Sequence, residues 1–160
     1  ENYLYVYGQS HGLDYTILRL SNVYGPRQDP FGEAGVVAIF SQAMLNGEPV
    51  VINGSGEQER DFLYVQDVVE ASIASLEGGS GKAFSIGTGV GASVNQVYSL
   101  LKKLSNYRHE ASHGPQKLGE VFKIYLDISK ARQELGWEPR FSLEDGLRDT
   151  LEWFRSAAWV

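Results

Sequence analysis

The sequence contains no cysteine and only three histidines, His11, His109 and His113. The absence of thiols excludes disulfide bonds and thiolate metal sites, and three scattered histidines, expected to be solvated, form no metal-binding motif. No apolar run reaches the roughly 18 residues that a membrane-spanning helix needs. The first residues, Glu1 to Leu4, lack the basic and apolar regions of a signal peptide. We therefore expect a cytoplasmic protein with no metal and no membrane contact.

Basic residues are also scarce, with 14 Lys and Arg against 20 Asp and Glu and a formal net charge of -6. Nucleic-acid-binding proteins usually present a basic face, so no nucleic-acid partner is expected. An acidic total still permits one local basic pocket for a phosphate. The chain does not begin with Met, which we interpret as the sign of a piece of a longer protein.

The 160 residues, 42% of them hydrophobic, are enough for one domain with its own core but not for two full domains. The 18 glycines indicate many loops. No repeat, low-complexity tract or linker divides the chain. We therefore treat residues 1–160 as one unit.

The apolar pattern predicts alternating helices and strands. Residues 2–12 are typical of the end of a helix that closes at Gly12, and residues 15–20 of a strand directly after it, as in half of a β-α-β unit. Residues 21–30 are expected to form a loop because of their Gly and Pro content. Further helices are predicted at 35–45, 67–76, from 93 to 104, before Gly136 and after Ser142, and further strands at 50–52, 62–65 and 82–86.

Several residues are assigned local roles by their spacing. Ser93 with Gln96 forms a capping box, Ser142 with Asp145 opens the last helix, and Asp127 or Ser129 caps the short helix that ends at Gly136. Tryptophans are expected to pack in the core or at its edge, rather than to stack on bases; they are Trp137, Trp153 and Trp159.

A glycine motif at residues 87–92, GTGVGA, fits the G-x-G-x-x-[GA] pattern of dinucleotide sites. It follows a predicted strand, precedes a predicted helix, and has an acid near the expected distance at Glu110. Residues 108–113 are too polar for the buried second strand of such a unit. This polarity favours a structural glycine turn over a cofactor site.

Arg60 lies between a glycine loop and an apolar strand. There its guanidinium could clamp a diphosphate through two hydrogen bonds. The alternative is a surface ion pair with Asp61 or Glu59, which spacing alone favours.

Asn22 follows directly on the strand at 15–20. Its amide either donates to an anionic or carbonyl oxygen or serves as a turn residue. Asn53 and the backbone near Val36 and Val37 are weaker candidates, and Lys117 by itself is an exposed lysine. The residues alone leave these alternatives open.

Five segments, taken in order, strongly resemble the C-terminal half of the NAD-dependent epimerase/dehydratase family, the extended short-chain dehydrogenases. They are residues 18–28 (LRLSNVYGPRQ), 32–37 (GEAGVV), 54–68 (GSGEQERDFLYVQDV), 84–89 (FSIGTG) and 126–131 (LDISKA). Within the family the closest likeness is to UDP-glucose 4-epimerases. The resemblance implies an α/β fold: the C-terminal substrate-binding portion of an extended Rossmann-type epimerase, including one strand of the parent parallel sheet.

The same resemblance assigns residues to NAD and to the diphosphate of a UDP-sugar. Leu20 and Ser21 are expected beside the nicotinamide, Asn22 on the diphosphate, and Arg60 on the phosphates. Lys117 stands where the family usually has Arg, so a point charge replaces a two-pronged donor and the implied contact is weaker.

The uridine is expected along a separate set of residues from two segments. The resemblance implies that these are Val36, Val37, Val51 and Asn53. By the same likeness, the glycine motif at Gly87 is a turn of the substrate domain.

The resemblance also implies which parts lie outside these 160 residues. In the family the N-terminal half carries the NAD fingerprint, the Ser or Thr that polarises the sugar oxygen, and the Tyr-x-x-x-Lys pair. We therefore expect no catalytic residue here and no activity of the chain alone, although the family oxidises the sugar transiently at C4 with NAD.

Two alternatives remain open: half of a sister dehydratase, decarboxylase or reductase, or a binding or assembly module without catalysis. Self-association is expected in each case, because the strand at 15–20 would be left with a bare edge.

Overall fold

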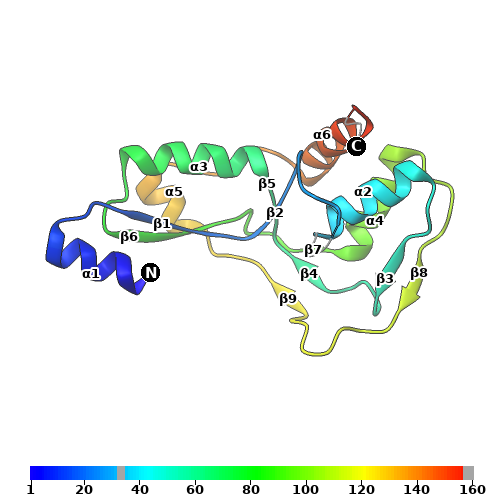
Figure 1. Ribbon diagram of the computed structural model, residues 1–160, viewed down its shortest axis with the longest axis horizontal. Helices are drawn as coiled ribbons and strands as arrows, with labels where there is room; N and C mark the ends of the chain where they lie inside the picture. Colours follow the sequence, from blue (N-terminus) through cyan, green and yellow to red (C-terminus); the bar gives the residue numbers. More distant parts are fainter. Residues whose placement is uncertain (32–34, 157–160) are drawn as a thin grey trace.

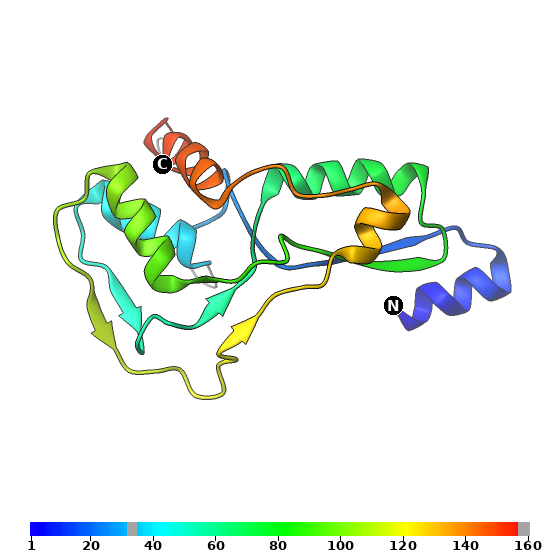
Figure 2. The same ribbon diagram turned by 180° about the vertical axis from the view of Figure 1, so that it is seen from behind.

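The computed structural model describes residues 1–31 and 35–156, so Trp159 and residues 32–34 of the resemblance lie outside the described part. Figures 1 and 2 show an elongated arrangement of helices around several short sheets. In chain order the elements are α1 (Asn2–His11), β1 (Thr16–Leu20), β2 (Asn22–Tyr24), α2 (Val36–Asn46), β3 (Val51–Asn53), β4 (Glu59–Arg60), β5 (Phe62–Tyr64), α3 (Val65–Glu77), β6 (Lys82–Ile86), β7 (Ala92–Ser93), α4 (Val94–Ser105), β8 (Ser112–Gly114), β9 (Lys123–Ile124), α5 (Ser129–Leu135) and α6 (Leu143–Ser156).

One half of the molecule is built on a parallel strand pair. β1 pairs with β6 from Thr16–Lys82 to Leu20–Ile86. α3 and α1 lie on opposite sides of this pair (Figures 1 and 2). A core cluster fills the space toward α3 and α5: Leu63, Ala71, Phe84, Ile86, Ala131 and Trp137. This arrangement confirms the α/β class, and β1, the expected sheet strand, has a parallel neighbour in β6.

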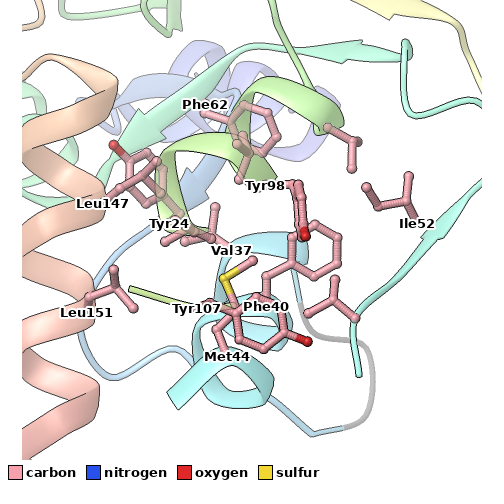
Figure 3. Close-up of a cluster of buried hydrophobic side chains, with 14 of the residues drawn as sticks. Tyr24, Val37, Phe40, Met44, Ile52, Phe62, Tyr98, Tyr107, Leu147 and Leu151 are labelled. Atoms are coloured by element: carbon pink, nitrogen blue, oxygen red, sulfur yellow. The ribbon is translucent and has the colours of Figure 1, made fainter. Parts of the chain in front are cut away.

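The other half is a layer of helices, α2, α4 and α6, around a larger core (Figure 3). α2 was expected to be apolar nearly all round, and its Val37, Phe40 and Met44 are buried. They face side chains of α4 and α6, among them Val97, Tyr98, Leu101, Leu147 and Leu151. The capping box that opens α4 is present in both directions, since the Gln96 amide donates to the Ser93 hydroxyl oxygen and the Ser93 amide to the Gln96 side chain.

Short strands connect the two halves. β2 pairs in parallel with β5, and β3 with β8. β4 is the middle strand of the order β7–β4–β9. The prediction of a loop over residues 21–30 was therefore wrong at its start: residues 22–24 are a strand, which the following Gly25-Pro26 makes too short to recognise by pattern.

The predicted helix at residues 67–76 exists as α3, but its apolar stripe faces outward. Val69, Ile73 and Leu76 are exposed, whereas Asp67 and Ala71 are the buried positions. The Asp67 carboxylate explains its own burial, because it accepts hydrogen bonds from the backbone amides of Arg140 (2.8 Å) and Phe141 (3.4 Å). Asp67 thus ties α3 to the segment that leads into α6.

Candidate functional site

A cavity of about 310 Å³ lies where β2, β4, β5 and the first turn of α2 meet. Its walls hold five residues that the sequence predicted for one site: Asn22, Val36, Val37, Arg60 and Lys117. The other described lining residues are Val23, Tyr24, Gln28, Gly35, Gln58, Phe62, Val94 and Glu120. We call this space the Arg60 cavity.

The strand pairing brings Asn22 to the cavity. The Asn22 amide donates to the Asp61 carbonyl (2.9 Å), and the residue pairs with Phe62 across β2 and β5. Asn22 is therefore a strand residue and not a turn residue, with an exposed side chain at the cavity wall.

The first turn of α2 provides the second wall. Val36 and Val37 follow the N-cap Gly35, which makes no side-chain capping bond. A helix N-terminus carries partial positive charge and unpaired amides, both of which favour an anion.

Arg60 is the main cation of the cavity, and its ion-pair partner is neither of the two residues considered from the sequence. Its Nη2 donates to Glu120 Oε1 at 2.9 Å and its Nη1 to the Glu59 backbone oxygen at 2.8 Å. Arg60 and Glu120 are largely shielded, with side-chain exposures of 16% and 23%. An Asp61 or Glu59 carboxylate pair was thus wrong, and Glu120 takes that place.

A tight turn presents both Lys117 and Glu120 to the cavity. The Glu120 amide donates to the Lys117 carbonyl at 3.4 Å, and Gly119 between them has φ +76°. Glycine adopts this left-handed backbone without steric cost, so the turn depends on it. Lys117 is exposed, and no ion pair within residues 1–31 and 35–156 involves it.

Four predicted residues lie outside the lining of the Arg60 cavity. Val51 is exposed on β3, and Asn53 at the end of that strand accepts a bond from Gln58 at its backbone oxygen (3.0 Å). Leu20, 46% exposed, ends β1, and the Ser21 hydroxyl is buried without a hydrogen-bond partner. Val51 and Asn53 are thus not brought together with Val36 and Val37.

The glycine motif binds an internal carboxylate. Asp61, only 1% exposed, accepts bonds from the Thr88 amide and hydroxyl (both 2.7 Å), the Gly89 amide (3.1 Å) and the Leu126 amide (3.2 Å). A Cβ at Gly87 would overlap this carboxylate. The motif is therefore the structural turn that the polarity argument favoured, and its amides are already used.

Sequence reasoning missed several polar groups of the cavity. Gln28 has a buried Oε1 with no hydrogen-bond partner. Burial raises the pKa of the Tyr24 hydroxyl, which donates to the Leu143 backbone oxygen at 3.3 Å, so this group is a neutral donor and not a base. The glutamines carried no sequence signal, but the K-L-G-E turn could have indicated Glu120.

A larger hollow of about 880 Å³ shares Phe62 with the Arg60 cavity but differs in charge. It is lined by apolar groups such as Val90, Leu100 and Phe141 and by the acids Glu57 and Glu59, with no Lys or Arg among its described residues. An anionic ligand is therefore favoured in the smaller cavity. None of the helices in the described residues is long and apolar enough to span a membrane.

Comparisons with known proteins agree on one family. The model of the NAD dependent epimerase/dehydratase family matches residues 1–87. A UDP-glucose 4-epimerase of Mycolicibacterium smegmatis is 41% identical over 157 residues, which cover 98% of this chain and 50% of that protein. The chain spans about half the length of the curated relatives it matches.

Solved structures give the same result. The UDP-glucose 4-epimerase of Thermotoga maritima, crystallised with UDP-glucose, has a TM-score of 0.95 and 52% identity over 97% of this chain and 50% of its own. The UDP-glucose 4-epimerase of Thermus thermophilus, in complex with NAD, has a TM-score of 0.90 and 38% identity over 98% of this chain and 51% of its own.

Proposed function

Because the chain belongs to the NAD dependent epimerase/dehydratase family, we propose that residues 1–160 form the UDP-sugar-binding part of a nucleotide-sugar 4-epimerase. The observation that carries this proposal is the Arg60 cavity, in which five residues predicted from the sequence line one space beside two cations. Similar proteins include epimerases whose structures hold UDP-glucose and NAD.

The cavity suits a nucleoside diphosphate in its distribution of charge. Arg60 and Lys117 offer positive charge to the diphosphate, and the Asn22 amide adds an uncharged donor. The unpartnered Gln28 oxygen offers an acceptor to an N–H of the base. Val36 and Val37 give the nucleoside an apolar wall.

A UDP-sugar held in this way is fixed by its nucleotide. The described lining contains no free histidine and no carboxylate other than the Arg60-paired Glu120, so it binds rather than moves protons. Firm nucleotide binding with a loosely held hexose fits a reaction in which the sugar must turn before it is reduced again.

NAD supplies hydride acceptance and return in this family, and the residues present fit only one end of it. Leu20 and the orphaned Ser21 hydroxyl lie at the carboxyl end of β1, where parallel sheets bind ligands, and we propose that they border the nicotinamide. The amides of the glycine motif are occupied by Asp61, so they are not available for the NAD pyrophosphate. The proposal therefore includes no tight NAD binding and no turnover by the 160 residues alone.

Calorimetric titration of the chain with UDP and with uridine tests this function. We expect weak UDP binding and an Arg60→Ala variant that loses roughly 1.5 to 3 kcal/mol of UDP affinity, the usual value for a hydrogen bond to a charged group, with uridine binding little changed. Arg132→Ala, an exposed ion-paired arginine on α5, is the matched control and should leave UDP affinity unchanged. Equal UDP affinity in wild type and Arg60→Ala would contradict the proposed site.

A further inference from the structure

The Arg60–Glu120 pair places a carboxylate on the cation that the proposed function assigns to the ligand's phosphates. Two N–H groups of Arg60 are engaged, one by Glu120 Oε1 (2.9 Å) and one by the Glu59 carbonyl (2.8 Å). We propose that Glu120 is an internal competitor for the diphosphate, an anion of the protein that holds Arg60 until a ligand displaces it. This inference rests on the proposed function and specifies how its site is controlled.

The geometry favours displacement over a shared arrangement. A carboxylate and a phosphate that bind the same guanidinium from one cavity repel each other, and this repulsion is strong where both are partly shielded from water. Glu120 is 23% exposed and Arg60 16% exposed, so water screens the pair only partly. With Glu120 in place, the charges of Arg60, Lys117 and Glu120 sum to one positive charge, too little for a diphosphate.

The turn that carries Glu120 can release it without disturbing the core. Gly119 adjoins open space, Leu118 is fully exposed, and the turn's bond from the Glu120 amide to the Lys117 carbonyl is long at 3.4 Å. The firm backbone contact begins only at Phe122, whose carbonyl accepts from the Glu59 amide at 2.8 Å. Few bonds therefore oppose a movement of the turn.

The turn also joins two opposite effects in four residues. Lys117 brings a cation with no ion-pair partner among residues 1–31 and 35–156, while Glu120 brings the competing anion. When Glu120 leaves Arg60, the diphosphate gains both cations. Affinity is thus set by the difference between the Arg60–phosphate and Arg60–Glu120 interactions, and Glu120 lowers it.

The test removes the negative charge of Glu120 and measures binding of UDP, inorganic pyrophosphate and uridine to the 160-residue chain by calorimetry. Glu120→Gln should tighten UDP and pyrophosphate binding by roughly five- to fiftyfold, the range of a typical coupling between two sites, and leave uridine unchanged. Glu120→Ala should act in the same direction, which keeps the test valid if one variant folds poorly.

Glu59→Gln is the matched control, because it removes the same charge from the neighbouring residue. The Glu59 side chain pairs with Lys123 (2.6 Å) and lines the larger hollow, outside the Arg60 cavity. We expect its UDP affinity to change less than twofold.

Two results overturn the competition, and they differ from failure of the proposed function. UDP binding that is unchanged or weaker in Glu120→Gln, while Arg60→Ala still abolishes it, would show that Glu120 positions Arg60 or contacts the ligand; the proposed function would stand. Absence of UDP and pyrophosphate binding in wild type and both variants would reject both proposals.

Discussion

Replacement of Asp61 by Asn should destabilise the fold strongly, because the carboxylate is the hub between the glycine turn and the segment before α5. It is 1% exposed and accepts four hydrogen bonds, two at each oxygen. An amide keeps one oxygen but turns an NH2 group toward the two donors at the other, Gly89 and Leu126. Two bonds to a charged acceptor, at about 1.5 to 3 kcal/mol each, are then lost.

The expected loss for Asp61→Asn is thus about 3 kcal/mol or more, against a total of roughly 5 to 15 kcal/mol for a domain. For a chain of this length it lowers the melting temperature by roughly 6 to 12 °C. Urea unfolding followed by circular dichroism measures it. Thr88→Val, which removes only the hydroxyl donor, should lose about 1 kcal/mol. A loss below 1 kcal/mol for Asp61→Asn, or an effect confined to UDP affinity, would refute the structural role.

Three further outcomes are expected. Lys117→Arg should bind UDP roughly three- to tenfold more tightly by calorimetry, since a two-pronged donor replaces a point charge; a weaker complex would show that the turn cannot aim it. Burial raises the pKa of Asp67 above its model value of 3.8, so the ionised form is disfavoured when folded and its contribution to stability falls as pH rises through the interval between the unfolded and folded pKa; thermal melts should show the advantage of wild type over Asp67→Asn larger at pH 3.5 than at pH 7, and a constant difference would contradict this. Light scattering should detect self-association, because α1 buries none of its residues and exposes Tyr3, Tyr5 and Tyr7; a monomer at high concentration would count against it.

Local signals predicted most of the elements because they act within a few residues. The capping box at Ser93 and the left-handed glycine at Gly12 fix helix ends through nearby backbone bonds, and both are present in the structure. The strand at residues 22–24 was missed because its partner, β5, is distant in the chain and its own three residues carry no period. The outward stripe of α3 shows that spacing identifies a helix but not the side that is buried.

The candidate site was predicted in its cations but not in their partners. Arg60, Asn22 and Lys117 could be named from local context and from the family resemblance, and they do meet in one cavity. Glu120 and Gln28 come from segments far from Arg60 in the chain, and only the pairing of β4 with β9 and the fold of the 25–35 connection bring them there. Val51 carried a role in the resemblance that its exposed position on β3 does not reproduce within this cavity.

The strand pairing has a consequence for how the chain folds. Every strand pair in the described residues joins distant segments, as in Thr16–Lys82, Val51–Ser112 and Glu59–Lys123, and none is a hairpin. Each pair therefore requires closure of a long loop, which makes the folding rate slow for the chain's size. During synthesis β1 has no partner until β6 has emerged, so a nascent chain exposes that strand to aggregation and to chaperones for longer than a hairpin-based sheet would.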